Sequence, residues 1–346
     1  MKFHKGGTNY YLGILLICFS LSSCNNPTSS RAKEEANHGK GQAVPVIFDT
    51  DIGGDFDDVG AMAMLHALAD RGEVEILATV SCNLSPLVVP AISVINTYFG
   101  RPDIPIGSPK SPTRNQDARE LHWHDSLIVH YPYTYKSTDE APDAVMTYRK
   151  VLSQQPDSST TIISVGWVTN MMNLLLSQPD SISPLNGEEL VAKKVKLWVA
   201  MIGGFPEWER ESNAVSDTLA TQYALDNWPT PIIFSGFEIG VKVKTGWRLV
   251  KEGPADSPIR MAYRISLPMR PGYINGNSSF DQTAVLVAIR GFEPYYSYKA
   301  GQFITTDHGS NSWMDDPNGR HKYLVQKMSP DSVAFEIETL MMHRPD

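Results

Sequence analysis

The chain has 346 residues, of which 42% are hydrophobic and 10% are aromatic. This composition supplies enough apolar surface for a sizeable core and excludes a chain that stays disordered. The formal net charge is −8, and it becomes more negative if Lys2 and Lys5 are removed with a leader. Such an acidic balance argues against nucleic acid or an anionic membrane surface as a partner.

Residues 1–23 predict a signal peptide. Two lysines open it, and residues 10–21 (YYLGILLICFSL) form an apolar run too short to span a bilayer. Residues 21–24 (LSSC) resemble the bacterial lipobox, in which the cysteine, here Cys24, becomes the lipidated first residue after cleavage. The alternative is an ordinary signal sequence that contains a cysteine. The lipobox interpretation predicts an exported lipoprotein, periplasmic or facing the cell surface, that meets the membrane only through its lipid.

Residues 24–42 are rich in Asn, Ser, Lys, Glu and Gly and show no apolar periodicity, which predicts a flexible tether. The folded domain is expected over residues 43–346. Cys18 would leave with the signal peptide and Cys24 would carry lipid, so Cys82 has no partner for an intramolecular disulfide.

Strands and helices are expected to alternate along this domain. The apolar runs predict strands over 44–48, 75–80, 104–106, 160–165, 196–202 and 231–235. Helices are predicted over 59–68, 87–99, 144–153, 170–176, 218–227, 284–289 and 330–342. Alternation at this spacing predicts one α/β domain with a mostly parallel, doubly wound, Rossmann-like sheet. In such sheets ligands bind at the carboxyl ends of the strands, so we expect the functional site there.

The segment 46–61 (VIFDTDIGGDFDDVGA) is the most acidic part of the chain and joins the first strand to the first helix. Crowded carboxylates raise one another's pKa unless a cation lies among them, and oxygen ligands at this density suit Ca²⁺ or Mg²⁺. Gly53 and Gly54 permit the sharp turn. The alternative is a solvated acidic loop. The five carboxylates belong to Asp49, Asp51, Asp55, Asp57 and Asp58.

Further polar or glycine turns follow predicted strands at the same rim: 81–83 (SCN), 166–170 (GWVTN) and 203–204 (GG). Residues 211–217 (ESNAVSD) lie on the long loop after Gly204, and residues 280–284 (FDQTA) open an apolar helix. The acidic segment, 81–83, 166–170, 211–217 and 280–284 make up five motifs. Taken in this order, they resemble the nucleoside hydrolase family of the inosine–uridine-preferring type over about Val46 to Gly291. That family opens with Asp-x-Asp, a glycine turn and Asp-Asp-Ala. Here the turn is two residues longer, which makes Asp55 an accessory.

The resemblance implies a role for individual residues. Asp51 would act as the general base. The ligands of a bound Ca²⁺ would be Asp51, Asp58, Asp281 and the carbonyl of Thr169. The contacts to the substrate would come from Asp57, Asn83, Glu211 and Asn213. An aspartate at the start of a helix is most often an N-cap, so Asp281 alone is weak evidence.

Two departures from the family concern the leaving base. Phe280 stands where the best-known members have a histidine that helps to protonate the base. The family's His-Gly-Asp-Gly region is replaced by residues 120–125 (ELHWHD). In this segment His122, His124 and Asp125 either supply the acid or form a polar surface loop.

The resemblance predicts hydrolysis of the N-glycosidic bond of ribonucleosides to free base and ribose. The partner would be a small-molecule ribonucleoside, and homo-oligomerisation is left open. A haloacid dehalogenase-type phosphatase needs Thr or Val where Gly53 stands, and an EF-hand needs Glu where Gly60 stands. A lipid-anchored nucleoside- or sugar-binding protein of the same fold without turnover stays open because of Phe280.

Overall fold

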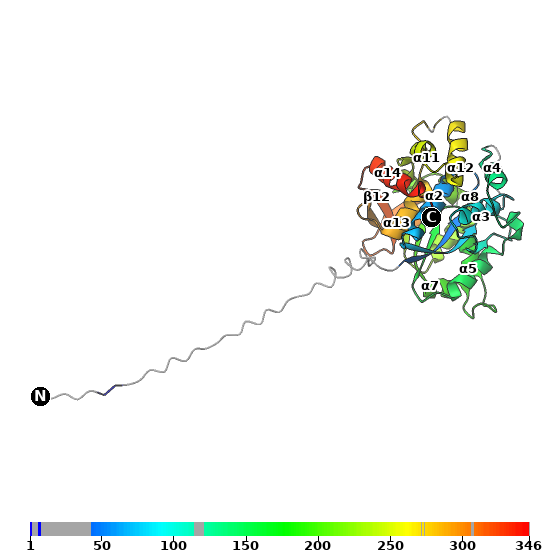
Figure 1. Cartoon of the computed structure of the whole chain (residues 1–346). Coiled ribbons are helices and arrows are strands. Elements are labelled where there is room, and N and C mark those ends of the chain that lie inside the picture. Colours follow the sequence, from blue (N-terminus) through cyan, green and yellow to red (C-terminus); the bar gives the residue numbers. More distant parts are fainter. Residues whose placement is uncertain are drawn as a thin grey trace. The chain divides into compact units, whose positions relative to one another are not determined.

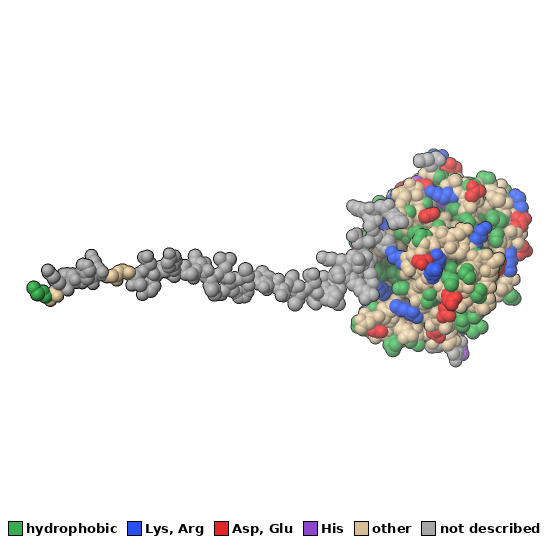
Figure 2. Space-filling view, turned by 90° about the horizontal axis from the view of Figure 1, so that it is seen from below, with side chains coloured by type: hydrophobic (Ala, Val, Ile, Leu, Met, Phe, Trp, Pro, Cys, Tyr) green, Lys and Arg blue, Asp and Glu red, His purple; other side chains and the backbone are tan. Residues whose placement is uncertain are grey.

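The computed structural model describes residues 1, 6–7, 43–113, 121–270, 272, 274–305 and 308–345. Cys24, the tether and nearly all of the predicted signal peptide therefore lie outside the described residues. Within the described ranges, no helix combines the length and apolar character that crossing a bilayer requires. Acidic, basic and apolar side chains are interspersed over the face of the folded part shown in Figure 2.

A ten-stranded sheet forms the centre of the domain, in the order β3-β2-β1-β4-β5-β7-β12-β10-β11-β6. Neighbouring strands from β3 to β12 are parallel, whereas β10, β11 and β6 form an antiparallel edge. The prediction of a mostly parallel α/β sheet is confirmed. The strands are β1 (Val44–Thr50), β2 (Val74–Ser81), β3 (Ile106–Gly107), β4 (Thr160–Ser164), β5 (Val195–Ala200), β6 (Glu207–Trp208), β7 (Ile232–Phe234), β10 (Tyr296–Thr305), β11 (Asn311–Asp315) and β12 (His321–Gln326).

Helices cover both faces of the sheet (Figure 1). One layer contains α2 (Asp57–Asp70), α3 (Val88–Tyr98), α12 (Pro258–Ser266), α13 (Phe280–Arg290) and α14 (Pro330–Met341), and α4 (Trp123–His130) packs on α3 and α12. The other layer contains α5 (Ala144–Ser153), α6 (Thr169–Leu176), α7 (Gly187–Lys194) and α9 (Thr218–Asn227). Short elements connect them: α8 (Ser212–Ser216), α10 (Phe237–Gly240), α11 (Trp247–Glu252) and the strand pair β8 (Lys244–Thr245) and β9 (Asn277–Ser278).

The sheet separates two hydrophobic cores, and successive residues of each central strand alternate between them. In β1, Val46 and Phe48 pack into the core under α2 and α13, while Ile47 packs into the core under α5 and α6. Successive side chains of a strand point to opposite faces, so a strand covered on both faces must be apolar throughout. This is why the unbroken apolar runs of the sequence form the parallel strands.

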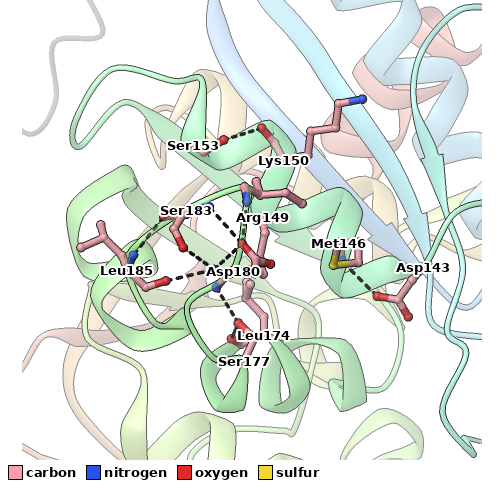
Figure 3. A network of polar contacts seen from close by, with 11 residues as sticks. Asp143, Met146, Arg149, Lys150, Ser153, Leu174, Ser177, Asp180, Ser183 and Leu185 are labelled. Atoms are coloured by element: carbon pink, nitrogen blue, oxygen red, sulfur yellow. Dashed lines mark hydrogen bonds and ion pairs between the residues drawn. The ribbon is translucent and has the colours of Figure 1, made fainter.

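A buried arginine fixes the connection between α6 and α7 (Figure 3). Arg149, on α5, donates to both carboxylate oxygens of Asp180 at 2.8 and 3.1 Å. It also donates to the carbonyls of Ser183 at 3.1 Å and Leu185 at 3.0 Å. The hydrogen bond from Arg149 holds the pKa of Asp180 at about 2. Because this buried guanidinium is paired with a carboxylate and two carbonyls, we assign it a structural role.

Candidate active site

The acidic turn joins β1 to α2 at the carboxyl edge of the sheet, as expected. Asp57 and Asp58 are the first two residues of α2, where the helix dipole favours negative charge. Carboxylate oxygens of Asp55, Asp57 and Asp58 all lie within 4.8 Å of one another. Asp55, predicted to be an accessory, is therefore a member of the carboxylate cluster.

The start of α13 faces the start of α2 across this cluster. One carboxylate oxygen of Asp57 accepts hydrogen bonds from the backbone amides of Phe280 at 3.1 Å and Asp281 at 3.4 Å. The Thr50 hydroxyl donates to the carboxylate of Asp58. These contacts bring Asp281 next to Asp57, which lies more than 200 positions earlier in the chain. Asp57, Asp58 and Asp281 are all buried.

The electrostatics of the cluster fit a cation. Burial raises the pKa of Asp51, Asp57 and Asp281 well above the usual range, and repulsion from the carboxylates of Asp55 and Asp58 adds to the rise at all three. Burial, with the negative charge of Asp55, raises the pKa of Asp58 to about 8. Buried carboxylates at this spacing need a compensating positive charge, and an all-oxygen donor set suits a hard divalent ion.

Arg270 brings one positive charge of the chain to the turn. Its guanidinium donates to the carbonyl of Gly54 at 3.0 Å. Burial raises the pKa of Asp55, and the charge of Arg270 opposes that rise. One guanidinium beside one of several carboxylates leaves most of the negative charge of the cluster to be balanced by another cation.

Asp49 lies beneath the cluster and was given no role from the sequence. One oxygen of its carboxylate accepts hydrogen bonds from the Tyr148 hydroxyl and the Asn170 amide, both at 2.9 Å. The same amide of Asn170 donates to the carbonyl of Ser81 at 2.9 Å. Burial raises the pKa of Asp49 to about 7. Asp49 therefore ties the end of β1 to α5, α6 and β2. Its partners are distant in sequence, so the acidic pattern that singled out Asp49 could not indicate this role.

The structure places Asn83 against the acidic turn and Thr169 against the N-cap residue of α9. The Asn83 amide donates to the backbone carbonyl of Asp51 at 2.8 Å, and its side-chain oxygen accepts from the Ser85 amide at 3.0 Å. The Thr169 hydroxyl donates to Asp217 at 2.5 Å. Asp217 in turn caps α9 through its other carboxylate oxygen. In this structure Asn83 thus holds the backbone at Asp51, and the side chain of Thr169 faces Asp217.

Glu211 and Asn213 fix the loops that follow β4 and β5. The Glu211 carboxylate accepts from the backbone amides of Asn213 at 2.9 Å and of Gly203 and Ala214 at 3.0 Å. The Asn213 amide donates to the carbonyls of Val165 at 3.0 Å and Met201 at 2.9 Å. Burial raises the pKa of Glu211 despite these hydrogen bonds. Both side chains are therefore held in one orientation.

A cavity of about 100 Å³ lies where these segments meet. It brings together five predicted residues, namely Asp51, Asp57, Glu211, Asn213 and Asp281. The other lining residues, which sequence analysis did not identify as site residues, are Asp55, Val165, Met201, Ser212, Phe237 and Phe280. Phe280 was noted only for the histidine that it replaces. The carboxylates and the aromatic rings thus form two chemically different parts of one wall.

The structure does not bring the three candidate acids to this cavity. His122 is exposed and lies 3.6 Å from the half-buried Asp125. His124 is buried, and its ring stacks on that of Trp123 with 3.5 Å between the ring centroids. Burial lowers the pKa of His124 to about 3, so its ring is neutral near pH 7. None of the three is among the described residues that line the cavity.

Several solved structures share this fold. An inosine–guanosine nucleoside hydrolase is 18% identical, with a TM-score of 0.65, over 87% of this chain and 99% of that chain. A purine-preferring ribonucleoside hydrolase from Gardnerella vaginalis is 16% identical, with a TM-score of 0.65, over 87% and 97%. The effector protein XOO4466 is 14% identical, with a TM-score of 0.68, over 91% and 97%. At these identities the likeness concerns the fold.

No curated protein matches the chain. A model of the inosine-uridine preferring nucleoside hydrolase family matches residues 46–326, which is most of the folded domain. The match extends past Gly291, where the resemblance seen in the sequence ended, and includes β10, β11 and β12. The chain belongs to the inosine-uridine preferring nucleoside hydrolase family.

Proposed function

We propose that this chain hydrolyses the N-glycosidic bond of ribonucleosides, releasing the free base and ribose. The observation that carries the proposal is the convergence of carboxylates from three distant segments on one cavity. These are the turn after β1, the start of α8 and the start of α13. Cleavage of this bond passes through a ribosyl cation-like state, and buried carboxylates placed beside that state stabilise it.

The metal in this proposal is Ca²⁺. Asp51, Asp58 and Asp281, with the carbonyl of Thr169, would hold it, and the raised pKa values of the three aspartates favour a cation among them. A bound Ca²⁺ would supply Lewis-acid activation of a water. Side chains of the protein itself would accept the proton, stabilise the positive charge and contact the sugar.

Asp51 is proposed to accept the proton of the attacking water, which makes it the general base. The hydrogen bond from Asn83 to its backbone carbonyl fixes its position. Asp57 and Glu211 place negative charge beside the developing cation. Asn213 lines the same cavity and is proposed to contact the hydroxyls of the sugar. The backbone hydrogen bonds of Glu211 and Asn213 hold both in advance, so little reorganisation is needed during the reaction.

A binding protein without turnover is the second candidate. Phe237 and Phe280 favour it, because this aromatic part of the wall offers no proton to a leaving base. In either case we propose that Cys24 carries the lipid of an exported lipoprotein.

The test is multiple turnover by the purified domain over 43–346. Free reducing sugar is measured with a panel of ribonucleosides and p-nitrophenyl riboside in the presence of calcium. Asp51→Asn should lower kcat by at least roughly 10²-fold, whereas Asp103→Asn, at an exposed aspartate far along the chain from the cluster, should not. If the wild type releases no sugar from any substrate, or Asp51→Asn keeps wild-type turnover, the binding-protein hypothesis replaces the hydrolase.

A further inference from the structure

A second, larger hollow opens beside the aromatic part of the cavity wall. It has a volume of about 810 Å³ and is lined by residues 207–210 and 310–312, on β6, on β11 and in the adjoining loops. We call it the outer groove. The sugar-binding proposal does not use it, and its volume exceeds that of the cavity several-fold.

Three aromatic rings connect the cavity to the outer groove. Phe280 and Phe237 line the cavity, and their ring centroids lie 5.1 Å apart with 29° between the planes. Phe237 then meets Trp208 of the groove at 4.8 Å and 34°. The rings therefore form a packed series, which we call the aromatic surface, that begins beside the carboxylates and ends in the groove. A planar heterocycle attached to a ribose in the cavity would meet the ring of Phe280 or Phe237, because both line the cavity.

Two glycines allow the rings to take these positions. A Cβ at Gly240 would lie 2.5 Å from the Cα of Phe280, and a Cβ at Gly204 would lie 2.8 Å from the indole of Trp208. Any side chain at these two positions would displace the rings. The aromatic surface is thus set by backbone packing and does not depend on a ligand to form.

The charge around this surface is negative. Glu207 and Glu209 line the outer groove with one opposing cation, Arg210. The cavity at the other end contains the carboxylates of the acidic turn, Glu211 and Asp281. Aromatic faces also carry partial negative charge and attract cations. A heterocycle lying on the rings would therefore be stabilised most if it carried a positive charge.

The chemistry of the leaving group also favours a substrate with a positively charged heterocycle. When the bond from C1′ to nitrogen breaks, its electron pair stays on the nitrogen, so an uncharged base leaves as an anion unless it receives a proton. A quaternary, positively charged heterocycle leaves as a neutral molecule and needs no proton. Water then adds to C1′ and gives up one proton. Phe237 and Phe280 cannot donate a proton, so an uncharged base that leaves on the aromatic side of the cavity without another donor is handicapped by roughly 10²–10⁴-fold.

We propose that the preferred substrates are ribosides of positively charged N-heterocycles, such as N-ribosylpyridinium ions or N7-alkylated purine ribosides. The heterocycle contacts the ring of Phe280 or Phe237, and the carboxylates of the outer groove stabilise its positive charge from beyond the rings. This inference rests on the proposed hydrolase function and names its substrate class.

The experiment uses three substrates on the acid side of neutrality with calcium present. 7-Methylguanosine and guanosine differ in the charge and one methyl group of the base, and p-nitrophenyl riboside has an uncharged group that leaves without a proton. We expect kcat/KM for 7-methylguanosine to exceed that for guanosine by at least roughly 10²-fold. Because a methylated purine is also intrinsically more labile, variants of the outer groove are needed to test recognition.

The double variant Glu207→Gln and Glu209→Gln should raise KM for 7-methylguanosine by roughly 2–10-fold and leave p-nitrophenyl riboside unchanged. Trp208→Leu should raise the same KM by roughly 2–5-fold. Glu188→Gln, at an exposed position on α7, is the matched control. If p-nitrophenyl riboside is hydrolysed but guanosine matches 7-methylguanosine, or the variants raise both KM values equally, the inference is wrong and the hydrolase proposal stands. If p-nitrophenyl riboside is not hydrolysed, the hydrolase proposal fails and this inference fails with it.

Discussion

Gly166 offers the sharpest test of how the site is built, because it lies against the proposed general base. A Cβ at this position would be 2.7 Å from the Cβ of Asp51, 2.7 Å from the sulfur of Cys82 and 2.8 Å from the amide nitrogen of Asp51. Ordinary contact begins near 3.5 Å. In Gly166→Ala the end of β1 or the start of the loop after β4 must therefore move by about 0.7 Å.

The magnitude follows from this displacement. A misplacement of about 1 Å can cost roughly 10²-fold in rate, so we expect kcat for p-nitrophenyl riboside to fall roughly 10–100-fold in Gly166→Ala. Overpacking of this kind also costs about 1–3 kcal/mol of unfolding free energy. The assay is steady-state turnover with calcium, together with thermal unfolding to confirm that the variant is folded at the assay temperature.

Two control variants separate the displacement of Asp51 from other effects. Gly272→Ala should be silent, because a Cβ at Gly272 meets no atom within 4 Å. Adding Cys82→Ala to Gly166→Ala removes the sulfur but leaves both Asp51 atoms in the way, so activity should not return. Wild-type kcat in folded Gly166→Ala, or full recovery in the double variant, would refute the close packing of Gly166 on Asp51 as the cause.

Three further predictions concern the metal, acid stability and anchoring. Asp58→Ala should lose most of the bound calcium found in the wild type by elemental analysis, and equal calcium in both would contradict the proposed metal site. Burial lowers the pKa of His66 from 6.5 to about 3, so its contribution to stability is present above pH 6.5 and is lost as the pH falls toward 3. Between pH 6.5 and 4 the unfolding free energy of the wild type should therefore fall by roughly 3 kcal/mol more than that of His66→Gln. If the two proteins lose unfolding free energy equally over this range, His66 makes no such contribution. In the full chain, Cys24→Ser should move the protein from the membrane fraction to the soluble fraction, and unchanged fractionation would contradict lipidation.

The parallel strands and the acidic turn could be predicted because their signals are local. β1 is buried on both faces and must be apolar on both, which gives the unbroken run 44–48. The acidic turn follows one of these runs directly, and the carboxyl ends of parallel strands meet at one edge. The order of the strands therefore already implied that Asp51 and Glu211 would converge, while Asp281 was placed with them only by the family resemblance, and the cavity contains all three.

The antiparallel edge of the sheet could not be predicted in the same way. Most residues of β10 are exposed or half-buried, so its sequence shows only a weak apolar pattern. β12 joins the parallel part by pairing His321 with Ile232, a contact between residues that lie far apart in the chain. Its place in the sheet depends on this long-range pairing.

The walls of the cavity and the position of the histidines were also beyond local patterns. Val165, Met201 and Phe237 line the cavity because three separate strand ends meet there. The local sequence of residues 120–125 does not indicate which histidine is exposed and which is buried. In the structure His122 is exposed and His124 is buried. In both cases the decisive contacts come from elements that are distant in sequence.

The energetic cost of the site favours hydrolysis over binding alone. A neutral sugar can be held by neutral hydrogen-bonding groups, which cost little to bury when they are paired. Here the cavity instead contains several carboxylates. The proposed Ca²⁺ would balance Asp51 and Asp281, but Asp57 and Glu211 would remain beside the sugar, and burial raises the pKa of both. Ribose in its ground state carries no positive charge that would offset this cost. The ribosyl cation-like transition state does, so in the proposed reaction Asp57 and Glu211 would stabilise it more than they stabilise the bound sugar, and such a difference accelerates a reaction.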